Sequence, residues 1–269
     1  MRLGQVSHLR PDADDHHCMK ARFLSMLLAL ALVATACGVG GPPEALASFE
    51  MSSLVLNPGS SAAGFVDIGE TRVTYVAVTP EGFTQGDTAP VLLAFPPGAQ
   101  DLSVTQSTID RVYMQEALRL GWVVVSPVSP DGTLFFQGAE DVLPSFANWI
   151  EQWVTLEGGA LHVAGMSNGG LSSWRFAAQN PDRVQSLITF PGFPSSGSDR
   201  DAMENLTDIP IRLYVGGNDA AWVEPMQETS TDMAILGGRL SLEIFPGENH
   251  IVESTYDGRI VFEQLESFR

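Results

Sequence analysis

The ten residues LHVAGMSNGG, positions 161–170, decide the fold of this chain. An apolar run stops there at a Gly-x-Ser-x-Gly pattern centred on Ser167, and a helical pattern follows at residues 171–179. A serine that attacks a carbonyl projects from a sharp, strained turn between a strand and a helix, where neighbouring side chains would clash. Gly165 and Gly169 remove those side chains. We therefore predict a nucleophile elbow; the alternative is a glycine-rich turn after an ordinary strand.

The predicted elbow also supplies a group that stabilises negative charge. The N–H of Asn168, at the start of the following helix, is placed to bind the oxyanion that forms during acyl transfer. A second N–H donor is expected from the loop PPGAQD at residues 96–101. Because its two prolines have no N–H, this donor is Gly98, Ala99 or Gln100, and we favour Ala99.

Strand and helix patterns alternate along most of the chain. Two leading strands, at 64–68 and 71–78, are predicted to pair antiparallel. The later patterns predict strands at 91–95, 121–126, 160–164, 184–190, 211–215 and 240–245, and helices at 102–120, 139–156, 171–179, 224–236 and 256–268. This order predicts an α/β fold with a mostly parallel sheet, helices on both faces, and a ligand site at the carboxyl ends of the strands. The short segment 190–210 leaves room for only a minimal cap.

His250 is the expected base for Ser167, because histidine is the usual partner of a nucleophilic serine. The three histidines before residue 20 precede the predicted domain, and His162 lies inside the strand that leads to the serine. His250 instead follows the last predicted strand, in a loop before the final helix. The alternative is an ordinary surface histidine.

An acid that orients the base is expected between the serine and the histidine in sequence. Asp219 fits, because it directly follows the strand predicted at 211–215, and Glu224 is the runner-up. The remaining aspartates of this region lie ahead of that strand and are interpreted as solvated loop charges: Asp199, Asp201 and Asp208.

Residues 1–37 are predicted to be a leader. A short basic segment at 19–22 precedes an apolar run at 23–36, which ends in small residues and Cys37. This order is typical of a secretory signal, and the run is short for a membrane span. Its end resembles a bacterial lipobox, in which Cys37 would be lipidated and would tether the protein to a membrane; plain secretion is the alternative. Met19 is an alternative start.

Residues 38–53 are predicted to be a tether and residues 54–269 the catalytic domain. Both cysteines of the chain, Cys18 and Cys37, lie in the leader, so no disulfide is expected in the domain. From residue 38 onward there are 29 acidic residues, 10 arginines and no lysine, a net charge of −19. Such a surface repels nucleic acid and anionic membranes and indicates a neutral substrate or a saline habitat. A solvated acidic surface that keeps the protein soluble is the simpler interpretation.

Four motifs carry a family resemblance: GMSNGG at 165–170, NPDR at 180–183, GGND at 216–219 and GENH at 247–250. Together they resemble the α/β-hydrolase superfamily, and more narrowly the secreted esterases grouped with polyhydroxybutyrate depolymerases and feruloyl esterases. The resemblance implies Ser167, Asp219 and His250 as a catalytic triad, with no metal and no organic cofactor. The chain departs from those esterases after the first parallel strand, where it has Phe-Pro-Pro-Gly in place of a His-Gly pair.

The expected activity is hydrolysis of carboxylic esters through an acyl-enzyme, with small, aromatic or polymeric ester substrates. Trp222, Phe193, Phe135 and Phe136 lie on predicted loops near the active end and are expected to form an aromatic binding cleft, with core packing as the alternative. Two other functions stay open: a serine peptidase on the same fold, and a lipoprotein binding module that has lost catalysis.

Overall fold

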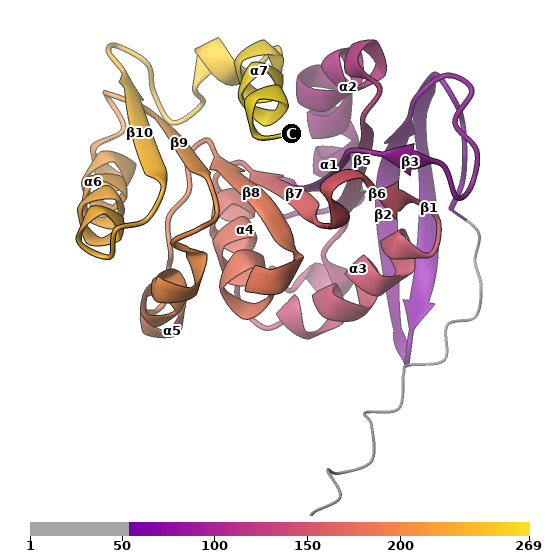
Figure 1. The fold of residues 1–269 in the computed structure, drawn as a ribbon, viewed down its shortest axis with the longest axis horizontal. Helices are drawn as coiled ribbons and strands as arrows, with labels where there is room; N and C mark the ends of the chain where they lie inside the picture. The colour runs from indigo at the N-terminus through magenta and orange to yellow at the C-terminus, as the bar shows by residue number, and fades with distance from the viewer. Residues whose placement is uncertain (1–53) are drawn as a thin grey trace, which may run out of the picture. The chain divides into compact units, whose positions relative to one another are not determined.

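Eight strands form one sheet in the computed structural model, which describes residues 54–269 (Figure 1). The two leading strands are antiparallel, and from the third position the neighbouring strands are parallel, so the predicted α/β-hydrolase arrangement is confirmed. Across the sheet, the strands are β1 (Ser60–Ile68), β2 (Thr71–Thr79), β5 (Val123–Pro127), β4 (Val91–Phe95), β7 (Leu161–Gly165), β8 (Val184–Thr189), β9 (Ile211–Gly216) and β10 (Leu240–Phe245).

The central strands are apolar runs because both of their faces are covered. Every residue of β4, β5 and β7 is buried, whereas β1 at the edge of the sheet has several partly exposed residues. A parallel strand with helices on both faces has no solvent side, so its sequence does not alternate between polar and apolar residues. The run before Ser167 is therefore a central strand, and it places the serine in the middle of the sheet's carboxyl edge.

Helices cover both faces of the sheet (Figure 1). Two separate clusters of buried apolar side chains lie between the sheet and its two helical layers. One layer contains α1 (Leu102–Thr108), α2 (Met114–Leu120) and α7 (Arg259–Phe268), with a π-helical segment at Ile109–Tyr113 joining α1 to α2. The other contains α3 (Leu143–Glu151), α4 (Asn168–Gln179), α5 (Gly197–Asp201) and α6 (Ala220–Ile235).

Four predicted helices have wrong boundaries, and one of them is α4, which begins three residues before the predicted start at 171. The helix predicted at 139–156 is limited to α3, because Pro144 lies in its first turn, where the missing N–H has no intrahelical partner to lose. The chain after it forms β6 (Thr155–Leu156), which pairs with β3 (Thr88–Ala89) in the predicted loop before β4. Helix α6 starts four residues before the predicted Glu224 and contains a proline. Helix α7 starts after a glycine with φ 75°, three residues later than predicted.

The segment between β8 and β9 is short, as predicted, and packs beside α4. Its 3-10 turn Ala202–Leu206 buries Met203 and Leu206 in the core. Asp199 was expected to be solvated, and that expectation is wrong: it is 1% exposed and forms a two-point ion pair with Arg175 of α4. A buried carboxylate needs such a partner, because desolvation of an unpaired charge is costly.

The predicted leader, the predicted lipidation site Cys37 and the predicted tether lie outside the described residues. Within residues 54–269, no helix is both long enough and apolar enough to cross a membrane.

Candidate active site

Ser167 lies at the sharp turn between β7 and α4, with φ 57° and ψ −120°. A non-glycine residue with positive φ is strained and is held there by its surroundings. The turn also requires its glycines, because a Cβ on Gly165 would lie 2.1 Å from the carbonyl oxygen of Gly169, and a Cβ on Gly169 would lie 2.1 Å from that of Phe95. The N–H of Ser167 donates to the carbonyl of Pro191 (2.9 Å). The predicted strand, tight turn and helix are all present.

A chain of two hydrogen bonds joins the three residues of the predicted triad. Ser167 Oγ lies 2.8 Å from His250 Nε2, and His250 Nδ1 lies 2.6 Å from Asp219 Oδ2. An ionised carboxylate only accepts hydrogen bonds, so Nδ1 carries the imidazole proton and Nε2 is left to accept from the serine hydroxyl. The Asp219 side chain is 12% exposed and that of His250 is 42% exposed. The His250 side chain is therefore accessible from solvent, while the Asp219 carboxylate is shielded.

The histidine loop, residues 246–250, is held against the end of β9. Asn218 makes two of the contacts: its N–H donates to the carbonyl of Glu248 (2.9 Å) and its side-chain amide to that of Gly247 (2.8 Å). The backbones approach so closely that a Cβ on Gly216 would lie 2.1 Å from a carbonyl oxygen of this loop. The GGND motif thus both contains Asp219 and fixes the loop that carries His250.

Residues 96–101, which we call the proline loop, lie against the elbow. Gln100 is fully buried, and its amide nitrogen donates to the carbonyl of Pro96 (3.1 Å) and to Ser172 Oγ (2.9 Å). Its amide oxygen accepts from the N–H of Phe135 (3.1 Å). The predicted oxyanion donor Ala99 lies at the exposed tip of this loop, beside Gly98. The anchoring role of Gln100 was missed because nothing in the sequence reveals that its side chain turns inward.

Two of the four predicted cleft aromatics lie at the site. Trp222 packs against His250 with ring centroids 4.9 Å apart, and Phe193 packs edge-on against Trp222 at 5.2 Å. Trp222 lies in the first turn of α6, and not on a loop as predicted. The prediction for Phe135 is wrong, because its side chain is fully buried in the core; Phe136 is half-buried on the same segment.

The remaining ionisable candidates lie apart from this hydrogen-bonded chain. The runner-up acid Glu224 is exposed on α6, where it borders a surface depression. His162 is fully buried, with Nδ1 2.7 Å from Ser186 Oγ and no hydrogen-bond partner for Nε2 in the described part of the chain. Burial lowers the pKa of His162 to about 4, so this imidazole is neutral at neutral pH. Among residues 54–269, no three or more His, Cys, Asp or Glu side chains gather as a metal site.

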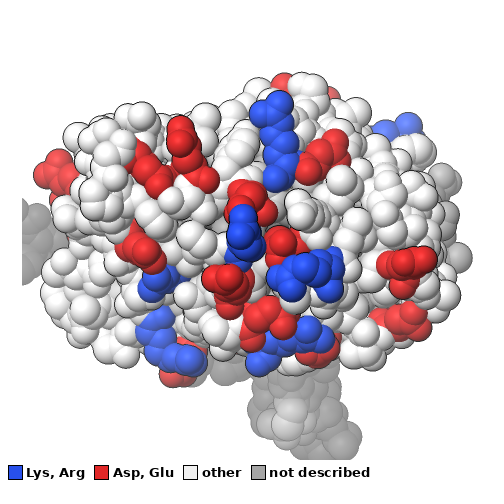
Figure 2. Space-filling view, turned by 90° about the horizontal axis from the view of Figure 1, so that it is seen from above, with Lys and Arg blue, Asp and Glu red and all other residues white. Residues whose placement is uncertain are grey.

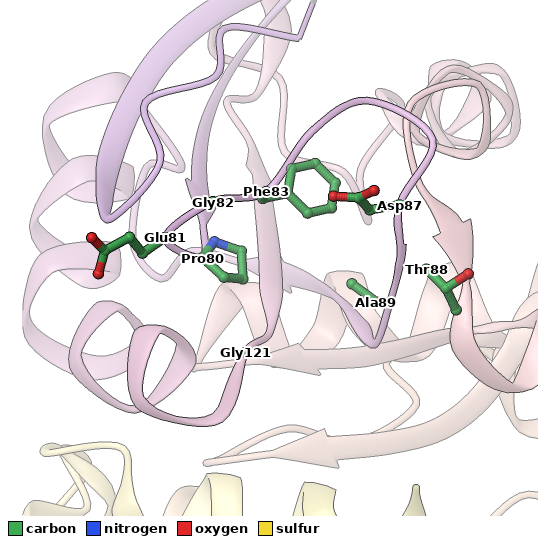
Figure 3. Close-up of a pocket in the computed structure, with 8 residues that line it drawn as sticks. All are labelled: Pro80, Glu81, Gly82, Phe83, Asp87, Thr88, Ala89 and Gly121. Atoms are coloured by element: carbon green, nitrogen blue, oxygen red, sulfur yellow. The ribbon is translucent and has the colours of Figure 1, made fainter.

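One cavity of about 330 Å³ belongs to the opposite end of the sheet (Figure 3). Its wall includes Phe83 and Asp87 from the loop that leads to β4, and Gly121, which precedes β5. Parallel strands carry their ligand sites at the carboxyl end, whereas this cavity lies where the strands begin. It is therefore not part of the site at Ser167.

No family model and no curated protein matches this chain. Solved structures do resemble it. A thermostable esterase aligns with 77% of this chain at a TM-score of 0.62 and 15% identity; the chain spans 62% of that esterase's length. The S-formylglutathione hydrolase of Agrobacterium tumefaciens aligns with 77% of this chain and 93% of its own, at a TM-score of 0.56 and 18% identity. Dipeptidyl peptidase 4 of Porphyromonas gingivalis aligns with 77% of this chain and 35% of its own length, at a TM-score of 0.58 and 13% identity. The described domain thus has the α/β-hydrolase fold.

Proposed function

We propose that this protein is a serine hydrolase that cleaves carboxylic esters through an acyl-enzyme intermediate. The observation that carries the proposal is the hydrogen-bonded chain from Ser167 through His250 to Asp219, located at the strained turn of an α/β-hydrolase fold. A serine hydroxyl is a weak nucleophile until an adjacent base takes its proton. Each contact needed for that transfer is present within hydrogen-bonding distance in the free protein.

In the proposed reaction, Ser167 Oγ attacks the ester carbonyl while His250 Nε2 takes the hydroxyl proton. The imidazolium that forms is stabilised by the carboxylate of Asp219, which also fixes the tautomer of the ring. His250 then gives the proton to the leaving alkoxide, so the alcohol departs and the acyl group stays on Ser167. Water attacks this acyl-enzyme with His250 again as the base, and the carboxylic acid is released.

Negative charge develops on the carbonyl oxygen in both steps. The N–H of Asn168, at the N-terminus of α4, is the first donor that we assign to it, because the N–H groups of the first helical turn have no intrahelical acceptor. We assign the second donor to the proline loop, residues 96–101. Removal of one such donor typically lowers kcat by about 10²–10³-fold.

The proposed substrates are neutral esters of small or aromatic acids, including polyesters. Trp222 and Phe193 form an apolar wall beside the base, which suits an aryl or alkyl group. Acidic residues outnumber arginines over the mature chain, which disfavours nucleic acid and other anionic partners. On the face covered by α2 and α7, the basic side chains lie among acidic ones and form no basic patch (Figure 2). Arg119 and Arg259, for example, are each paired with a carboxylate.

A serine peptidase is the second enzymatic candidate, since one of the similar structures is a dipeptidyl peptidase. We favour ester hydrolysis, because that peptidase shares only a third of its length with this chain and the segment after β8 packs beside α4 without forming a large cap. A binding module without catalysis has no need for three residues in hydrogen-bonded order. We further propose that the protein is exported, with Cys37 lipidated and serving as a membrane tether.

Hydrolysis of p-nitrophenyl esters from acetate to palmitate tests the proposal. We expect turnover by the mature protein and a loss of at least about 10⁴-fold in Ser167→Ala. Ser198→Ala is a matched control at an exposed position of α5, and it should retain full activity. A folded wild-type protein without turnover on this series, on benzoate and ferulate esters and on a soluble polyester would contradict ester hydrolysis.

A further inference from the structure

The proline loop has few N–H groups available for an oxyanion. Pro96 and Pro97 have none, and the N–H of Gln100 donates to the carbonyl of Pro97 (3.1 Å), which closes a tight turn. Gly98 and Ala99, the two central residues of this turn, are exposed, and among the described residues neither N–H has a backbone acceptor. The second donor is therefore one of these two groups.

The orientation of one peptide group distinguishes them. Gly98 has φ 59°, and Ala99 has no positive φ, which matches a type II′ turn, in which the central peptide stands across the plane of the turn. The carbonyl of Gly98 points toward α4 and accepts a hydrogen bond from Asn168 Nδ2 (2.8 Å). In a trans peptide the N–H points opposite to the carbonyl. The N–H of Ala99 therefore points away from the N-terminus of α4, where the first donor lies.

We infer that the side-chain amide of Asn168 is a positioning residue that locks the proline loop so that the N–H of Gly98, and not that of Ala99, is the second oxyanion donor. This inference rests on the proposed acyl transfer. Asn168 then contributes twice: its backbone N–H binds the oxyanion, and its carboxamide holds the peptide that follows Gly98.

Gln100 provides the second anchor of the same loop. Its buried amide is fully used by Pro96, Ser172 and Phe135, and Ser172 Oγ in turn donates to the carbonyl of Asn168 (3.0 Å). The buried Gln100 thus fixes the base of the loop. Among the hydrogen bonds of the described residues, only the one from Asn168 Nδ2 to the Gly98 carbonyl joins the exposed tip to another segment. Loss of the Asn168 carboxamide frees the tip without disturbing the buried base.

Three variants of the mature protein test this inference. Ala99→Pro removes the N–H of Ala99 at an exposed position without a positive φ. Asn168→Ala removes the carboxamide and keeps the backbone N–H, and Asn168→Asp replaces the donor with a carboxylate that repels the Gly98 carbonyl. We would measure kcat and KM for p-nitrophenyl acetate and the affinity for a trifluoromethyl ketone, which forms a tetrahedral adduct. Thermal unfolding reports whether each variant is folded.

We expect Ala99→Pro to keep kcat within about threefold of the wild type. Asn168→Ala should lower kcat about tenfold, the factor of one net hydrogen bond, with KM within twofold and ketone affinity reduced in parallel. The kcat of Asn168→Asp should be lower than that of Asn168→Ala. A merely structural role would lower the unfolding temperature without this separation of kcat from KM.

Two results would overturn the inference. A 100-fold loss of kcat in folded Ala99→Pro would make Ala99 the donor. Full activity in both Asn168 variants would show that the carboxamide positions nothing, and this result overturns the inference even where Ala99→Pro does not fold. If the wild type turns over no ester, the proposed function fails separately, and the rate at which a fluorophosphonate modifies Ser167 gives the same comparison of variants.

Discussion

Because the elbow and the proline loop are in close contact, we expect Gly169→Ala to lower both kcat and stability. An added Cβ would lie 2.1 Å from the carbonyl oxygen of Phe95 and 2.6 Å from that of Pro96. Both obstacles are backbone atoms, so neither can rotate away. The two segments must separate by about 1 Å to restore an ordinary contact, and a displacement of this size between reacting groups costs about 100-fold in rate.

We therefore expect kcat for p-nitrophenyl acetate to fall about 100-fold in Gly169→Ala, with a loss of about 1–3 kcal/mol in the free energy of unfolding from overpacking. Gly197→Ala is the matched control. A Cβ there would meet nothing within 4 Å, and φ is not positive, so activity and stability should stay at the wild-type level. Steady-state kinetics and urea unfolding measure both quantities.

A folded Gly169→Ala variant that keeps kcat within twofold of the wild type would refute this prediction. That result would mean that the elbow and the proline loop move together without disturbing the oxyanion site. A variant with normal kcat and lowered stability would separate packing at the elbow from catalysis, and would contradict the proposed coupling of the two segments.

Three further predictions concern the anchor of the histidine loop, the apolar wall beside His250 and the buried His162. Asn218→Ala removes a hydrogen bond to the histidine loop, so kcat should fall about tenfold and the free energy of unfolding by about 1 kcal/mol. Steady-state kinetics and urea unfolding measure these changes, and an unchanged kcat would show that the loop keeps its position without this bond. Trp222→Leu should lower the kcat/KM ratio of benzoate to acetate esters about fivefold through lost aromatic contact, and an unchanged ratio would remove Trp222 from the substrate site. The pKa of His162 is about 4 in the fold against about 6.5 unfolded, so the unfolded chain takes up an extra proton in this window and stability falls by about 3 kcal/mol as pH drops from 6.5 to 4. In urea unfolding, the stability of His162→Gln should fall by about 3 kcal/mol less than that of the wild type over this pH range. The same pH dependence in both proteins would contradict the assigned role of His162.

The fold was predictable because its decisive signals are local. The apolar run before Ser167, the glycines around it and the alternation of strands and helices each follow from neighbouring residues. The predicted strands at 91–95 and 240–245 match β4 and β10 at both ends. Helix boundaries were less certain, because capping and proline tolerance depend on tertiary contacts, as at the start of α6.

The order Ser167, Asp219, His250 was predictable from their positions after three strands, and the structure brings these residues into contact. The side chains that hold the proline loop in place could not be predicted from the sequence. Nothing local distinguishes the buried side chain of Gln100 from an exposed glutamine, or the carboxamide of Asn168 from a solvated one, because both act on carbonyls of other segments. Asp199 was misread for the same reason: its partner Arg175 lies 24 positions away in sequence.

The most direct test of the account is covalent labelling with a fluorophosphonate, followed by peptide mass spectrometry of the wild type and of His250→Ala. We expect a single phosphonyl group on Ser167 in the wild type and labelling slowed by at least 100-fold in His250→Ala. An unlabelled Ser167 in the folded wild-type protein, or labelling at the same rate without His250, would contradict the claim that the base activates this serine.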